Sequence, residues 1–187
     1  MAIEEPKYTS VLKEPPFEVR DYGATIVAEV VVTGNQGTVG RSGFRRLAGY
    51  IFGANKGSKR IAMTAPVTIR PQAAQSALAW PADKAAMSAD WAVWFTMPAS
   101  YKLADLPEPE NPEVHLKDRP AARFVVLRFS GLTGSVKLAA QTSRLMRFVE
   151  QHRLTSNGPV ALARYNPPWV PWFLRRNEIM VSVEATV

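Results

Sequence analysis

The sequence lacks cysteine, and it also lacks any long apolar run. Without cysteine the chain can form no disulfide, zinc ribbon, iron–sulfur cluster or thiolate nucleophile. No stretch approaches the roughly 18 consecutive apolar residues that cross a membrane, so no membrane span is expected. The start, MAIEEPKYTS, has neither the charged nor the apolar part of a secretory leader. We therefore expect a cytoplasmic protein as the sequence is written, or a periplasmic one if a leader was trimmed before Met1.

Acidic residues are few relative to basic ones. The 187 residues include 23 Lys and Arg against 16 Asp and Glu, which gives a net charge of +7. This excess favours anionic partners, but it does not distinguish phosphate, carboxylate and nucleic acid. Because the cations are spread along the sequence and no nucleic-acid-binding module is recognisable, we expect a solvated basic surface and no nucleic-acid partner. The sequence does not indicate an oligomeric state.

The first half of the sequence alternates strand and helix patterns. Polar–apolar alternation over 17–22 and a β-branched run over 25–32 predict two strands. The glycine-containing segment 33–40 is interpreted as a flexible connector. From Arg41 the apolar residues recur with helical spacing, which predicts a short amphipathic helix ending near Gly53. Two further strands and the Ala-rich connection between them are expected at 60–70, 90–98 and 71–89.

The second half repeats this order of elements. Prolines fill the segment 103–120, which predicts a linker near the midpoint. The strand, helix and two strands that follow are expected at 122–131, 135–154, 160–165 and 178–185. The 47% hydrophobic content supplies the core of one domain over 1–187. The sequence thus predicts an α+β fold of two β-α-β-β modules, about 17–98 and 121–187, that form a distorted antiparallel β-barrel flanked by two helices.

The segment YNPPWVPWFLRRNE, residues 165–178, concentrates two of the five tryptophans and three of the fifteen prolines. The prolines stiffen the segment and lower the entropy cost of presenting Trp169 and Trp172. Two interpretations of the indoles stay open, since they either face a ligand or fold inward as a plug.

Arg175 and Arg176 end this segment, where it meets the last expected strand. They either face the same ligand or pair with carboxylates such as Glu178 or Asp21 and fix the junction between the two modules.

Two longer blocks carry a resemblance to a known family. GFRRLAGYIFGANKGSKRIAMTAPV (43–67) and YNPPWVPWFLRRNE, with FEVRDY, WFTMPASY and FSG in the same order, make the chain resemble the SOUL haem-binding family over nearly its whole length. The resemblance implies the two-module barrel and the binding of haem or another tetrapyrrole in an apolar groove between the first helix and the 165–176 loop. The implied residues are Phe44, Leu47, Ala48 and Ile51 on one wall, Trp169, Val170 and Trp172 on the other, and Arg45, Arg46, Arg175 and Arg176 nearby.

These residue types suit a porphyrin. A porphyrin is a wide apolar disc with two carboxylates at one edge, so it needs aromatic and aliphatic side chains for its faces and guanidinium groups for its edge. Exposed carboxylate–guanidinium pairs add about 0–1 kcal/mol each. Most of the affinity would therefore come from burial of the disc, and the arginines would orient it.

One departure from the family concerns the iron ligand. The axial histidine proposed in the family lies in the segment that reads EVRDY here, and Asp21, a poor ligand for haem iron, stands in its place. Three alternatives stay open: binding through the apolar faces alone, coordination by His115 or His152, or loss of tetrapyrrole binding. With only two histidines, a multi-histidine metal site is excluded.

Three functions follow from these patterns. The one we favour is a small-molecule carrier or buffer for a tetrapyrrole. A haem-degrading, oxygenase-like enzyme is the second, and it would need an open iron face and one protein ligand. The third is an effector-binding module, because the two-module architecture is similar to gyrase-inhibitory-protein-like domains in which a groove carboxylate receives a cation. Glu178 could be that carboxylate, although its basic surroundings argue against a cationic guest.

Overall fold

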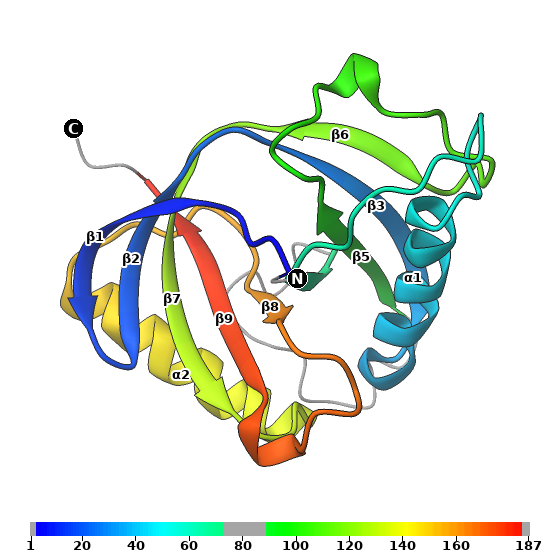
Figure 1. The fold of residues 1–187 in the computed structure, drawn as a ribbon. Helices are drawn as coiled ribbons and strands as arrows, with labels where there is room; N and C mark the ends of the chain where they lie inside the picture. The colour runs from blue at the N-terminus through cyan, green and yellow to red at the C-terminus, as the bar shows by residue number, and fades with distance from the viewer. Residues whose placement is uncertain (1–2, 73–88, 185–187) are drawn as a thin grey trace.

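A single curved antiparallel sheet of nine strands organises the computed structural model, which describes residues 3–72 and 89–184 (Figure 1). The strand order is β1-β2-β7-β9-β8-β4-β5-β3-β6. The strands are β1 (Tyr8–Glu14), β2 (Phe17–Tyr22), β3 (Thr25–Gly34), β4 (Val67–Pro71), β5 (Ala89–Thr96), β6 (His115–Arg119), β7 (Ala122–Ser130), β8 (Ala161–Arg164) and β9 (Arg176–Val183). The helices are α1 (Gln36–Ile51) and α2 (Ser135–Gln151), with short 3-10 turns η3 (Leu103–Asp105) and η4 (Trp172–Leu174).

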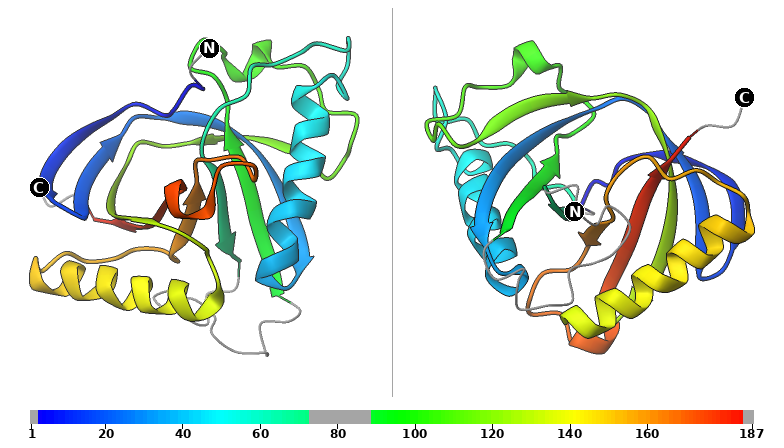
Figure 2. Two further views of the ribbon diagram at one scale, coloured as in Figure 1. Left: turned by 60° about the horizontal axis from the view of Figure 1, so that its bottom comes forward. Right: turned by 180° about the vertical axis from the view of Figure 1, so that it is seen from behind.

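The α+β class is confirmed, but the prediction of a barrel is wrong. A barrel requires the two end strands of the sheet to hydrogen-bond to each other. Here the end strands are β1 and β6; β1 pairs with β2 and β6 pairs with β3. The sheet is therefore open, and it curves around a concave face. The two helices lie on the outside of the curve, α1 beside β3 and β5 and α2 beside β7 and β9 (Figures 1 and 2).

The strand order is symmetric about the centre of the sheet. The series β7-β9-β8 mirrors β3-β5-β4, and the two meet where Ala163 on β8 lies opposite Thr68 on β4. The strand that precedes each series in the chain pairs with the other one, since β2 pairs with β7 and β6 pairs with β3. Each half thus completes the sheet of the other half.

Helix α1 begins earlier than the sequence pattern predicts. Asn35 caps it by accepting a hydrogen bond from the Thr38 backbone N–H at 3.1 Å. The helix then approaches the sheet so closely that a β-carbon at Gly43 would lie 2.7 Å from Val93. The interpretation of 33–40 as a flexible connector is therefore wrong for Gln36–Gly40. Gly40 in this segment serves close helix–sheet packing and not loop flexibility, because a β-carbon there would lie 2.8 Å from Ile69.

Two strands were not expected from the sequence. Strand β1 lies in the Pro-rich entry, and β6 lies at the end of the segment taken as a linker. Both are sheet edges with mostly exposed side chains, so neither shows the apolar alternation of a half-buried strand. The strand expected at 60–70 begins only at Val67. Residues 73–88 of the Ala-rich connection lie outside the described residues. Among the residues that are described, no helix is long and apolar enough to cross a membrane.

Candidate functional site

A buried ionic network occupies the middle of the concave face. Glu178 on β9 has a fully buried side chain, and its carboxylate accepts five hydrogen bonds. Arg20 of β2 donates two of them, at 2.8 and 3.2 Å. Arg176 donates two more, at 2.9 and 3.1 Å, and the Tyr165 hydroxyl donates the fifth at 2.7 Å. Two carboxylate oxygens offer about four lone-pair sites, so no acceptor capacity is left over.

The network fixes the charge state of its members. Burial alone would raise the pKa of Glu178, but the hydrogen bonds and positive charges of Arg20 and Arg176 outweigh burial and hold that pKa below its usual value. Burial likewise opposes the charge of Arg20, yet the Glu178 carboxylate raises the Arg20 pKa. Burial and the Glu178 charge raise the pKa of Tyr165, which therefore stays a hydrogen-bond donor. Glu178 is an ionised counter-ion for two arginines.

The network also holds the N-terminal segment over the concave face. The Arg176 guanidinium lies 3.7 Å from the centre of the Tyr165 ring and donates to the Glu5 carboxylate at 2.9 Å. The Arg20 guanidinium lies 4.3 Å from the Tyr8 ring. These contacts confirm, for Arg176, the interpretation that the arginines pair with carboxylates at the junction of the two halves.

The 165–176 loop presents its aromatic side chains to solvent. Trp169 is 81% exposed and Trp172 57% exposed, so neither folds inward as a plug. Phe173 and Leu174 are exposed beside them. The loop is nevertheless fixed in place, because Arg175 donates hydrogen bonds to the backbone carbonyls of Val170 and Pro168 at 2.8 and 2.5 Å. Arg175 thus holds the loop in this conformation.

Helix α1 offers less to a ligand than the sequence suggested. Leu47, Ala48 and Ile51 are buried in the core between α1 and the sheet. These residues lie on the face of α1 that packs on β3 and β5, so they are not available to a ligand. Phe44, 38% exposed and in edge contact with Phe95 at 5.6 Å, keeps an accessible surface, as does Arg45.

The loop and α1 do approach each other, at the N-terminal end of the helix. A β-carbon at Gly40 would lie 3.8 Å from the guanidinium of Arg164, the residue that ends β8 just before the loop. Gln36 in the first turn of α1 donates a hydrogen bond at 2.8 Å to the Thr133 carbonyl in the β7–α2 connection, where a β-carbon at Gly131 would lie 3.8 Å from Trp172 of the loop. Figure 2 shows the loop passing beside this part of α1. The segment that leads into the loop therefore lies beside the N-terminal part of α1, the helix that carries Phe44 and Arg45.

None of the three candidate iron ligands lies by the loop. Asp21 is paired with Arg123 on the neighbouring strand by two hydrogen bonds of 2.7 and 2.8 Å. His152 is the C-cap of α2, whereas the loop contacts Gly131 before the start of that helix. Since 17 residues of helix rise about 25 Å, His152 is far from the loop. His115 is the first residue of β6, and Figure 1 shows β6 on the opposite side of the molecule from the 165–176 loop.

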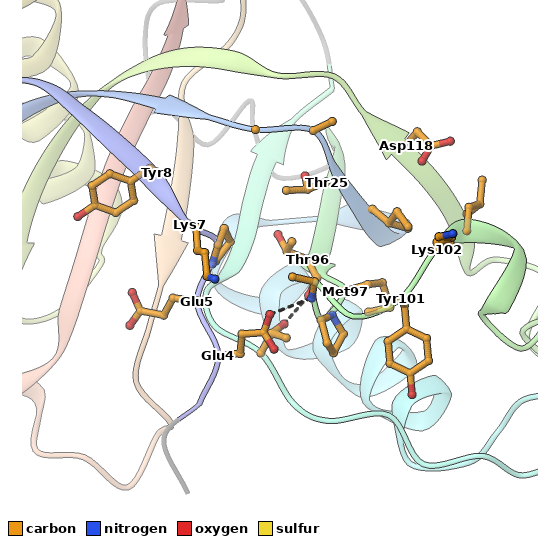
Figure 3. Close-up of a pocket in the computed structure, with 18 of the residues that line it drawn as sticks. Glu4, Glu5, Lys7, Tyr8, Thr25, Thr96, Met97, Tyr101, Lys102 and Asp118 are labelled. Atoms are coloured by element: carbon orange, nitrogen blue, oxygen red, sulfur yellow. Dashed lines mark hydrogen bonds between the residues drawn. The ribbon is translucent and has the colours of Figure 1, made fainter.

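Two hollows flank the N-terminal segment, and Glu5 and Tyr8 line both. The first has a volume of about 660 Å³ and lies between this segment, the start of β3 and the loop after β5 (Figure 3). Its edge is fixed by Glu4, whose carboxylate accepts the Ala99 N–H at 2.8 Å. The second, of about 600 Å³, lies between the β1–β2 hairpin and the end of the 165–176 loop. Sequence reasoning missed both hollows, because they depend on where the N-terminal segment crosses the sheet.

Metal binding by the described side chains finds no support in their arrangement. Across residues 3–72 and 89–184, no cluster of three or more His, Cys, Asp or Glu side chains could hold a metal ion. The acidic side chains of the concave face are paired with arginine or lysine instead.

Comparisons with known proteins agree with the geometry of the fold. The family model described as SOUL heme-binding protein matches residues 3–182. Heme-binding protein 1 of Xenopus tropicalis is 24% identical over 164 residues, which cover 87% of this chain and 81% of that protein. Heme-binding protein 2 of Mus musculus is 26% identical over 175 residues, 89% of this chain and 81% of that protein.

Among solved structures, the C-terminal domain of EcmrR is similar, with a TM-score of 0.62 and 14% identity. That similarity covers 96% of this chain and 99% of that one. At this level of identity the likeness concerns the fold alone.

Proposed function

The chain belongs to the SOUL heme-binding protein family, and on that premise we propose that it is a carrier or buffer that binds haem or another tetrapyrrole against the 165–176 loop. The observation that carries the proposal is that Trp169 and Trp172 are exposed on a loop that Arg175 holds in place through hydrogen bonds. Large apolar side chains held rigidly in solvent are costly unless they have a partner. A planar apolar ligand is a partner that family membership supports.

The side chains around the loop fit the faces of such a ligand. Trp169, Trp172 and Phe173 offer aromatic surface, and Phe44 on α1 offers a second ring on the helix side. Burial of apolar surface is worth about 25 cal/mol per Å², so contact with these rings can supply most of the affinity. A bound porphyrin would supply the metal and the absorbing macrocycle, and the protein would supply its apolar contacts.

Fewer arginines are available to the carboxylate edge of the ligand than the sequence suggested. Arg175 is engaged by loop carbonyls, Arg176 by Glu178 and Glu5, and Arg46 by Glu113 at 2.9 Å. Arg45 is exposed on α1 and has no hydrogen-bond or ion-pair partner within the described part of the chain, so it is a cation available to a propionate. The three arginines that are engaged fix the shape of the site.

Binding without a protein iron ligand is the form of the proposal that the side chains favour. His115, His152 and Asp21 all lie away from the loop, as described above. An oxygenase-like reaction would need one of them at the iron, and the effector-binding alternative would need Glu178 to exchange an arginine for a cationic guest. No contact in the described residues favours either alternative.

A spectroscopic titration tests the proposal. Haem added to the purified protein should give a shifted Soret band that saturates at about one equivalent. Metal-free protoporphyrin IX should bind with similar affinity, because the contacts are to the faces of the macrocycle and not to iron. A failure of both compounds to bind would reject the proposal. A strict requirement for iron would reject the claim that no protein side chain coordinates the iron.

A further inference from the structure

The second hollow lies outside the groove that we propose for haem. The β1–β2 hairpin lines it. Figure 1 shows this hairpin on one side of the 165–176 loop and α1 on the other. The volume of the hollow, about 600 Å³, falls within the range of small-molecule pockets, about 300–1,000 Å³. None of its lining residues belongs to α1. An occupant of this hollow therefore need not share the groove proposed for a tetrapyrrole.

Positive charge dominates the lining. Five cationic side chains line the hollow, against the carboxylates of Glu5 and Glu18, and Glu178 adds one buried carboxylate behind it. Five positive charges against three negative ones leave an excess of two. Low-dielectric walls focus such an excess onto a ligand more strongly than open water does. The cationic residues are Lys13, Arg20, Arg128, Arg175 and Arg176.

Two of these cations are free to meet a ligand. The Arg128 guanidinium makes no hydrogen bond or ion pair with any described residue, although the Arg128 backbone is fixed by the Pro16 carbonyl at 3.0 Å. The Lys13 ammonium lies across from Glu18 on β2 and helps lower the pKa of Glu18, but it makes no ion pair within the described chain. Both side chains are exposed. An anionic group in the hollow would therefore gain partners without displacing any existing ion pair.

Apolar walls adjoin these cations. The Tyr8 ring lines the hollow and is held in orientation by Arg20, 4.3 Å away, whereas the Phe17 ring lies on the other face of the sheet, where it stacks on Phe148 of α2. Leu174, 65% exposed, adds an apolar side chain to the lining on the side of the loop. Leu174 continues into the exposed surface of Phe173 and Trp172, so the apolar wall extends out of the hollow.

We propose that this hollow binds a single-chain anionic amphiphile, with its phosphate or carboxylate head between Lys13 and Arg128 and its apolar chain along Tyr8 and Leu174. Charge-assisted hydrogen bonds from a lysine and an arginine suit either head group. The apolar wall explains why a free inorganic anion is a poorer ligand. The proposal goes beyond tetrapyrrole binding and does not depend on it.

Calorimetric titration of the whole chain tests the proposal. The probes are dodecyl phosphate and dodecanoate, each below its micellar concentration, with inorganic phosphate and dodecyltrimethylammonium as partial mimics. We expect one equivalent of at least one anionic amphiphile to bind, and binding of both mimics to be at least about tenfold weaker. Equal binding of the cationic amphiphile would overturn the role of charge. Equal binding of inorganic phosphate would overturn the role of the apolar wall.

Paired variants locate the site. K13A/R128A should weaken binding of the amphiphile about tenfold or more, because two charge-assisted contacts are lost. The matched control K59A/R60A removes two exposed cations that do not line the hollow, and it should leave binding unchanged. K13R/R128K keeps both charges and should bind, which separates loss of the site from loss of folding. Unchanged affinity in K13A/R128A would overturn the assignment.

A haem titration of the same variants keeps the two proposals apart. Haem should bind K13A/R128A as it binds the unmodified chain, because the two sites lie on opposite sides of the loop. Parallel loss of haem and amphiphile binding would mean that the hollow is the tetrapyrrole site, which would overturn the claim of a separate site. Haem binding without any amphiphile binding would leave the function proposed above intact and reject this inference alone.

Discussion

Arg20 and Glu178 are 158 positions apart in the sequence, yet they form a buried two-bond ion pair at 2.8 and 3.2 Å. Their strands are not neighbours, since β7 lies between β2 and β9. The pair therefore fastens three strands of the sheet, and Arg176 extends it to the N-terminal segment. The rigid concave face that results is the support from which the 165–176 loop projects.

Removing the carboxylate at the centre of this network should be costly. Glu178→Ala leaves Arg20 and Arg176 without their main counter-ion, and loss of one partner of a buried pair costs about 3–5 kcal/mol. Urea unfolding measures the change in free energy of unfolding. Glu113→Ala, which breaks the exposed pair with Arg46, is the control and should cost about 1 kcal/mol or less. A similar small cost for both variants would contradict the role given to Glu178.

The same network makes stability depend on acid. The folded-state pKa of Glu178 is lowered, so the unfolded chain binds more protons than the folded chain once the pH approaches the ordinary glutamate value of 4.5. The stabilisation is present above that value and is lost as the pH falls through the lower folded-state pKa. Unfolding curves from pH 7 to pH 3 should therefore show a steeper loss of stability for the unmodified chain than for Glu178→Gln. Parallel curves would contradict the assignment.

Close packing of α1 on the sheet gives a contrast between two glycines of one helix. Gly43→Ala places a methyl group 2.7 Å from Val93 and should destabilise the fold by about 1–3 kcal/mol. Gly49→Ala meets only Ala54 at 3.9 Å, so the higher helix propensity of alanine should stabilise it by about 0.5–1 kcal/mol. Thermal unfolding of both variants checks the signs. Equal effects would show that Gly43 is not a packing contact.

Arg175 should affect haem binding through its position and not through its charge. Arg175 holds the loop through hydrogen bonds to the Val170 and Pro168 carbonyls. Both Arg175→Ala and Arg175→Lys should therefore weaken haem binding several-fold, because lysine cannot hold both carbonyls in the same way. Retention of full affinity by Arg175→Lys together with loss in Arg175→Ala would assign Arg175 to the propionate edge instead.

Neither histidine should contribute to the spectrum of a haem complex. His115→Ala and His152→Ala are each expected to leave the Soret maximum and the affinity unchanged, since both residues lie away from the loop. A shift of the Soret band in either variant would identify an axial ligand and move the site.

The sequence predicted the local elements better than the contacts between them. The strand expected at 17–22 coincides with β2, although both of its faces are covered, since Val19 packs in the core and Arg20 is buried in the ionic network. The start of α1 was missed because its glycines look like a flexible connector unless the sheet beneath them is known. Helical spacing identified Leu47 and Ile51 as apolar, but spacing cannot tell a core face from a ligand face.

The candidate site was predictable only in part. The sequence pointed to the 165–176 loop and to pairing of Arg176 with Glu178, two positions away, and both are present. It could not indicate Arg20 as the third member, because the register of strands separated by a third strand has no local signal. The outward direction of Trp169 and Trp172 also required the structure, since Arg175 and the loop carbonyls determine it.

The measurement closest to the central claim compares haem affinity across aromatic variants. W169A/W172A should weaken haem binding about tenfold or more, because it removes the largest apolar contacts of the proposed site. Phe52→Ala removes a 61% exposed aromatic side chain at the other end of α1 and should leave the affinity unchanged. Saturable binding with the same affinity in W169A/W172A as in the unmodified chain would contradict the account.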